Sequence, residues 1–132
     1  MIRGSCLCGS LAYEADAVLD MRHCHCRTCR KAHAAAFATT AGVERNAFRW
    51  IRGDAERGCF ESSPGKLRYF CTRCGSHLMA EHVGDPEVRL RIGSVDGGLS
   101  VLPEAHIWVS QAVAWDLGVD DLPRYAEGMP AR

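Results

Sequence analysis

The sequence has no excess of charge of either sign and no long apolar run. Its 132 residues carry 16 Lys and Arg against 16 Asp and Glu, so the formal net charge is zero. No overall field therefore attracts the chain to nucleic acid or to an anionic membrane surface. No stretch reaches the length of a membrane-spanning helix, and no apolar signal segment follows the first basic residues. We expect a cytoplasmic protein that binds neither nucleic acid nor membrane.

Internal repeats, low-complexity segments and an evident interdomain linker are also missing. A chain of this length is the size of one domain and can bury a core without depending on metal for all of its stability. We therefore expect residues 1–132 to form a single domain.

Cysteine, in contrast, is abundant, and seven of the eight cysteines lie in three clusters. The clusters are Cys6-Leu7-Cys8, Cys24-His25-Cys26-Arg27-Thr28-Cys29 and Cys71-Thr72-Arg73-Cys74. C-x-C and C-x-x-C spacings without an export signal fit metal ligation better than a disulfide framework. Cys59 stands alone, and we expect a small buried hydrophobic side chain there with no role in chemistry.

Seven clustered thiols divide into four and three. A structural zinc site is usually closed by four protein ligands, whereas a catalytic site has three and an open position. The economical division predicts two zinc ions per chain, one closed by Cys6, Cys8, Cys71 and Cys74 and one held by Cys24, Cys26 and Cys29.

The three-cysteine cluster has a second interpretation, because a histidine would make it another structural site. The candidates for that fourth ligand are His23, His25, His33 and His77, and spacing alone does not decide between the interpretations. Basic side chains beside the cluster, Arg27, Arg30 and Lys31, would favour the thiolate form.

Short alternating segments separated by turn residues indicate a mainly β protein, a sandwich of short antiparallel strands. Residues 27–33 predict a short helical turn, and the polar tail from Leu117 is expected to be loosely held. The strands are expected at residues 11–15, 18–21, 37–40, 48–52, 58–61, 67–70, 77–81, 88–92 and 107–109.

The cysteine clusters and their neighbours resemble the glutathione-dependent formaldehyde-activating enzyme family, which is related to centromere protein V. The resemblance is carried by Gly4-Ser5-Cys6-Leu7-Cys8-Gly9, by residues 23–33 (HCHCRTCRKAH) and by Phe70-Cys71-Thr72-Arg73-Cys74-Gly75-Ser76, and it extends to about Trp115. It implies an Mss4-like, zinc-bound β-sandwich. It also implies that the C-x-C and C-x-x-C pairs hold structural zinc and that Cys24, Cys26 and Cys29 hold catalytic zinc.

The resemblance further implies a carbon–sulfur lyase that condenses glutathione with formaldehyde to S-hydroxymethylglutathione. A zinc ion held by three thiolates is better suited to bind a substrate thiolate than to generate hydroxide. We expect a small thiol and a small carbonyl compound as partners, with His25 or His33 as the candidate for proton transfer. The alternatives are a zinc-stabilised binding module for protein or chromatin, and a redox or metal-buffering role for the exposed thiols.

Overall fold

The computed structural model describes residues 1–131, in which short strands dominate and α1 (Arg27–His33) is the one α-helix. Three single turns of 3-10 helix accompany them, at Arg45–Ala47, Ile92–Ser94 and Val109–Gln111. The strands are β1 (Ile2–Ser5), β2 (Ala12–Ala15), β3 (Asp20–Cys24), β4 (Ala38–Glu44), β5 (Phe48–Arg52), β6 (Arg57–Ser63), β7 (Lys66–Cys71), β8 (His77–His82), β9 (Glu87–Arg91) and β10 (His106–Ile107).

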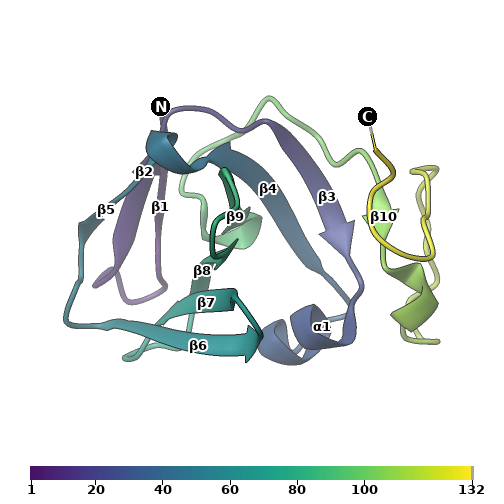
Figure 1. Ribbon diagram of the computed structural model, residues 1–132, viewed down its shortest axis with the longest axis horizontal. Coiled ribbons are helices and arrows are strands. Elements are labelled where there is room, and N and C mark those ends of the chain that lie inside the picture. The colour runs from purple at the N-terminus through teal and green to yellow at the C-terminus, as the bar shows by residue number, and fades with distance from the viewer. Residues whose placement is uncertain (132) are drawn as a thin grey trace.

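The strands form two sheets. The smaller sheet has the order β1-β2-β5, and the larger has the order β10-β3-β4-β9-β8-β7-β6. The larger sheet curves from β3 and β4 at one side to β7 and β6 at the other, with α1 between the ends of β3 and β6 (Figure 1). Neighbouring strands pair antiparallel except β10 and β3, which are parallel, with Ile107 opposite Cys24. The prediction of a mainly β fold is confirmed.

Asp20 joins three strands near the start of β3. Its carboxylate accepts a hydrogen bond from the backbone N–H of Gly42 on β4, and it forms ion pairs with Arg22 and, at 2.6 Å, with Arg89 on β9. A Cβ at position 42 would come within 3.0 Å of side chains on both neighbouring strands. Glycine therefore allows this buried ion pair to cross β4.

Each cysteine cluster belongs to a separate hydrophobic core. The larger core contains Cys6 and Cys71 with Leu11, Tyr13 and Leu78. The smaller one is formed by Cys24, Cys29, Ala38, Ala105 and Ile107. The two clusters are thus built into different parts of the packed interior.

The C-terminal tail is ordered against β10, so the prediction of a loosely held tail is wrong. The backbone N–H of His106 donates to Pro123, and that of Tyr125 donates back to His106. Tyr125 and Met129 pack against the smaller core. The polar composition of the tail did not predict this pairing, because backbone hydrogen bonds do not require an apolar pattern in the sequence.

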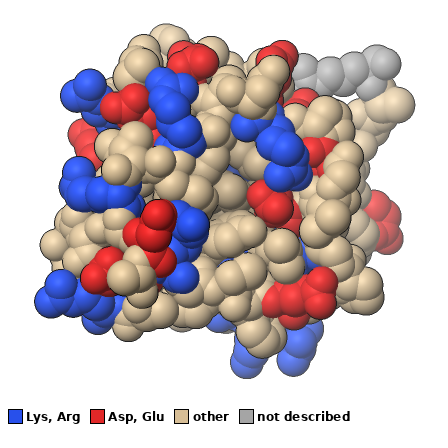
Figure 2. Space-filling view, turned by 60° about the vertical axis from the view of Figure 1, so that its left-hand side comes forward, with Lys and Arg blue, Asp and Glu red and all other residues tan. Residues whose placement is uncertain are grey.

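Basic and acidic side chains are interspersed on the face shown in Figure 2, as the zero net charge leads one to expect. Among the described residues, no helix is long and apolar enough to span a membrane.

Candidate metal centres

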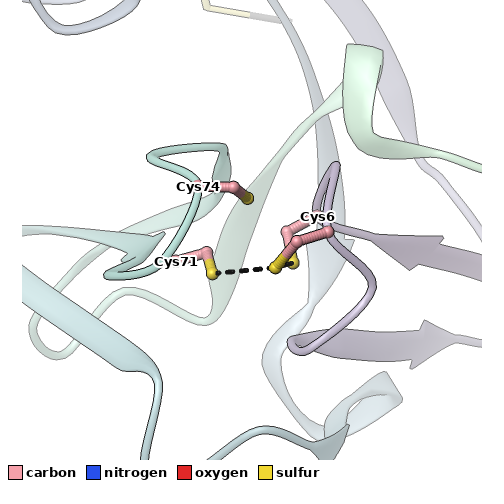
Figure 3. Close-up of side chains that lie close together, drawn as sticks. Cys6, Cys71 and Cys74 are labelled. Atoms are coloured by element: carbon pink, nitrogen blue, oxygen red, sulfur yellow. Dashed lines mark hydrogen bonds between the residues drawn. The ribbon is translucent and has the colours of Figure 1, made fainter.

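Cys6, Cys8, Cys71 and Cys74 bring four sulfur atoms together, all within 4.8 Å of one another. The side chains of Cys71 and Cys74 point toward Cys6 from the opposite side of the cluster (Figure 3). The Sγ atoms of Cys6 and Cys8 are 3.6 Å apart, and those of Cys8 and Cys71 are 3.8 Å apart. Sulfurs bound at about 2.3 Å to a tetrahedral zinc would be about 3.8 Å apart. This four-cysteine cluster therefore has the geometry of a closed thiolate site.

The two halves of the four-cysteine cluster share one local construction. Gly9 and Gly75, with φ of +81° and +79°, each follow a cysteine and turn the backbone in the left-handed region that glycine tolerates. The Gly9 N–H donates to the Cys6 carbonyl, and the Gly75 N–H donates to that of Cys71. The shared construction corresponds to a Cys-Gly step that the sequence repeats at Cys8-Gly9 and Cys74-Gly75.

Cys24, Cys26 and Cys29 form the second cluster, again with sulfur atoms within 4.8 Å of one another. Cys24 ends β3, whereas Cys26 is the N-cap of α1 and accepts the backbone N–H of Cys29 at 3.3 Å. Within residues 1–131, no histidine nitrogen or carboxylate oxygen completes this group. The three-cysteine cluster therefore offers three thiolate ligands, and a fourth position would be available to another molecule.

Hydrogen bonds divide the acidities of these thiols. Side-chain hydrogen bonds with Cys24 and Cys29 lower the pKa of Cys26, whereas hydrogen bonds with Cys26 and Cys29, followed by burial, raise the pKa of Cys24. The Thr28 hydroxyl lies 3.3 Å from Cys26 Sγ and also lowers its pKa. The pKa of Cys26 therefore lies below that of Cys24.

Arg68 and Arg91, on β7 and β9, are buried cations near the three-cysteine cluster that the sequence analysis missed. Arg68 is 3% exposed and donates from Nη2 to Cys29 Sγ at 3.6 Å and to the Thr28 hydroxyl at 3.2 Å. Arg91 is 5% exposed, and burial lowers its pKa to about 10 while Cys29 opposes that effect. The alternating sequence of these strands did not identify either arginine as a site residue. The strand pairing that brings them near the cysteines joins segments far apart in the sequence.

A cavity of about 580 Å³ opens at the three sulfur atoms, and we call it the thiolate cavity. Six cationic side chains line it against two acidic ones, Asp85 and Glu87. The cations are Arg22, Arg27, Lys66, Arg68, Arg89 and Arg91. Arg22 and Arg89 share the carboxylate of Asp20, so the remaining cations dominate the cavity. It can accept a ligand that carries negative charge.

The basic residues predicted from the sequence fall in different places. Arg27 lines the thiolate cavity, but Arg30 and Lys31 do not. Lys66 lines it instead, and burial followed by the charges of Arg91 and Arg68 lowers its pKa to about 8.

The candidate histidines lie in two different places. His25 is fully buried, and its Nε2 lies 2.8 Å from His106 Nδ1, whose own Nε2 is 2.9 Å from Asp120. The rings of His33 and His77 pack against each other with their planes tilted by 60° and their centroids 4.8 Å apart. Burial, then the charge of Arg91, lowers the pKa of His33 to about 3 and also lowers that of His77. Both rings are therefore neutral at pH 7.

Cys59 is exposed on β6, so the expectation of a buried side chain there is wrong. It lies opposite Tyr69 on an edge strand of the larger sheet, where Cys59, Phe60 and Glu61 are all exposed. The apolar residues around it in sequence did not reveal that edge position.

A mainly β chain with one four-cysteine and one three-cysteine cluster defines a class of protein built to hold metal at thiolate ligands. Residues 1–111 match the glutathione-dependent formaldehyde-activating enzyme family, and the chain belongs to that family. The fold is similar to the crystal structure of a Rhodobacter sphaeroides protein from a structural genomics programme, with a TM-score of 0.63 at 23% identity. That alignment covers 74% of this chain and 91% of the other.

Proposed function

We propose that this protein is a zinc-dependent carbon–sulfur lyase that condenses a small thiol, of which glutathione is the foremost candidate, with formaldehyde or a related carbonyl compound. The proposal includes two zinc ions per chain, a structural one at the four-cysteine cluster and a catalytic one at Cys24, Cys26 and Cys29. Family membership supports the reaction class. The single observation that carries the site assignment is that three convergent thiols line a cavity rich in cations.

Zinc held by three thiolates would bind the substrate sulfur as a fourth ligand and lower its pKa, which supplies a nucleophilic thiolate at neutral pH. Three thiolates and a divalent ion together carry one negative charge. Arg68, hydrogen-bonded to Cys29 Sγ, offsets that charge. Arg91 then provides a further buried positive charge that favours an incoming anionic sulfur.

Arg27 and Lys66 line the same cavity and can receive carboxylates of the thiol substrate. Lys66, with a pKa of about 8, can also exchange a proton near neutral pH. His25 is fully buried and bonded to His106, which leaves it without access to a substrate in the thiolate cavity.

Cobalt substitution tests the proposal, because a thiolate joining three others on tetrahedral cobalt strengthens the sulfur-to-metal charge-transfer absorption. Glutathione should produce this change at the three-cysteine cluster. Formaldehyde should then be consumed faster than in glutathione alone.

Cys26→Ser is the matched control, since it should abolish the thiol response while sparing the spectrum of the four-cysteine cluster. A cobalt spectrum that no thiol alters would contradict the lyase proposal. Binding of duplex DNA with a steep salt dependence would favour the chromatin module instead.

A further inference from the structure

A second cavity, of about 650 Å³, lies beside the four-cysteine cluster and is separate from the three sulfurs of the thiolate cavity. It is bordered by His33 at the end of α1, His77 at the start of β8 and Arg91 at the end of β9. Ala38, which pairs with Cys24 across β3 and β4, is also part of its wall. We call it the histidine cavity.

Three buried polar groups at the histidine cavity have no hydrogen-bond partner among residues 1–131. They are Nε2 of His33, Nδ1 of His77, and both Nε and Nη2 of Arg91. Buried polar atoms are nearly always paired, so a cluster of orphaned ones requires an explanation. A cavity with a few convergent polar groups is the usual form of a small-molecule site.

Of these three groups, Arg91 has the greatest need of a hydrogen-bond partner, because it carries a charge. Its side chain is 95% removed from solvent, as its 5% exposure shows, and it forms no ion pair with a carboxylate in the described part of the chain. Arg89, two residues earlier on β9, has Asp20 as its partner. The one acidic side chain lining the histidine cavity, Asp96, is exposed and occupied with the Ser5 hydroxyl. The thiolates of Cys29 and Cys24 offset part of the cost of burying its charge, but its Nε and Nη2 lack a direct hydrogen-bond partner, which a ligand carboxylate would supply.

Arg91 also lines the thiolate cavity, so this residue is shared by the two cavities. A ligand carboxylate bound to Arg91 would therefore lie next to the site of the reacting sulfur. In a 2-oxo acid the carbonyl carbon is bonded directly to the carboxylate. Docking that carboxylate on Arg91 would place the carbonyl beside the residue that the two cavities share.

We propose that the histidine cavity binds the carboxylate of the carbonyl substrate through Arg91, with His33 and His77 as additional hydrogen-bond partners, and that this substrate is a small 2-oxo acid of the glyoxylate type. The inference rests on the proposed lyase function and narrows its carbonyl partner. Formaldehyde has no anionic group for Arg91.

The reaction balances without an oxidant or reductant. The thiolate sulfur forms a bond to the aldehyde carbon, and the π electron pair of the carbonyl moves to oxygen. The proton that the thiol released on ionising returns to that oxygen. The product is a hemithioacetal whose carboxylate is unchanged.

Oxamate, a carboxylate-bearing carbonyl compound that does not form a hemithioacetal, is a suitable probe for binding to the zinc-loaded protein. Calorimetry should detect oxamate but not the neutral analogue oxamide. Arg91→Met should weaken oxamate binding at least about tenfold, because the charge-assisted bidentate contact is lost. Arg27→Gln removes a cation that lines the thiolate cavity but not the histidine cavity, and it should retain oxamate binding.

Thermal unfolding separates this role from a structural one. If Arg91 is an unpaired buried charge, Arg91→Met without ligand should melt at the wild-type temperature or above it. A marked fall in melting temperature would show instead that Arg91 stabilises the fold, and would overturn the proposal.

Substrate preference completes the test. Glyoxylate should be a better partner for the thiol than acetaldehyde, which has two carbons but no carboxylate, and Arg91→Met should remove that preference. If oxamate does not bind, or binds equally well to Arg91→Met, the 2-oxo acid assignment is contradicted. The lyase proposal would still stand in that case if a thiol altered the cobalt spectrum. Oxamate binding through Arg91 without any thiol response would contradict the lyase proposal and, with it, the role of the acid as a substrate.

Discussion

Arg68 on β7 donates a hydrogen bond to Cys29 Sγ on α1 across 39 positions of sequence. Its Nε also donates to the Ser62 hydroxyl at 2.8 Å, so the guanidinium is held in place on two sides. A fixed donor at a metal-binding sulfur tunes the charge and orientation of that ligand.

Replacing Arg68 with methionine should weaken metal binding at the three-cysteine cluster by about 10- to 100-fold, the usual effect of losing a hydrogen-bond partner of a ligand. The affinity can be measured by competition with a chromophoric chelator. Arg27→Gln, which removes a cation of the same cavity that has no bond to sulfur, should change the affinity less. Equal losses in both variants would mean that cavity charge alone matters.

The cysteine clusters could be predicted from the sequence because metal ligands recur at short, fixed spacings. The helix at residues 27–33 followed from the same segment, and the structure places α1 at Arg27–His33. Arg68, Arg91 and Lys66 could not be predicted, because they reach the cluster only through the register of β7 and β9 in the larger sheet. Long-range pairing determined which basic residues surround the sulfurs.

The strands were predicted mostly in the right places but with shifted ends. The apolar pattern of Phe48–Arg52 marked β5 fully, whereas β1 was missed because Ile2–Ser5 is short and contains a glycine. β1 is stabilised by pairing with β2 rather than by its own composition. Tertiary context therefore supplied what local propensity did not.

Lys66 should titrate far below an ordinary lysine. Lys31 and Lys66 are the two lysines of the sequence, so Lys31→Arg leaves Lys66 as the single lysine side chain. Burial lowers its pKa from 10.5 to about 8, and the neutral amine is the form that acylates. The acylation rate of Lys66, followed by mass spectrometry, should rise through pH 8 and then level off.

The lowered pKa of Lys66 also makes the free energy of unfolding depend on pH. Between pH 8 and 10.5 the unfolded chain holds more protons at Lys66 than the folded protein does, so this group should make folding more favourable as pH rises through that window. An acylation rate that still increases at about pH 10 would contradict the assignment of a buried amine beside Arg68 and Arg91.

His25 should act in folding rather than in proton transfer, because its ring is fully buried and bonded to His106. His25→Ala should lower the free energy of unfolding by about 1–3 kcal/mol, the cost of leaving a buried polar partner unsatisfied. It should leave the glutathione-induced cobalt band intact. Loss of that band in a variant that still binds two cobalt ions would instead assign His25 to the site.

Mild chelation should remove the two proposed zinc ions in sequence. The three-cysteine cluster has an open position at which a chelator can attack, whereas the four-cysteine cluster is closed by its own ligands. Metal analysis during stepwise chelation should therefore pass through a folded species with one zinc. Simultaneous loss of both ions on unfolding would contradict the division into four and three.

Cys71→Ser and Cys29→Ser should have unequal effects on stability. Cys71 is fully buried in the larger core, and its sulfur meets that of Cys8 from 63 positions away, so a metal there closes a long loop. Metal-binding free energy at such a site becomes folding free energy, so Cys71→Ser should fail to fold or lose most of its stability. Cys29→Ser should stay folded, because the smaller core keeps Ala38, Ala105 and Ile107, and should lose mainly its zinc at the three-cysteine cluster. Melting temperature and zinc content, measured on both variants, decide the matter: an equal fall in melting temperature would make the three-cysteine cluster structural too.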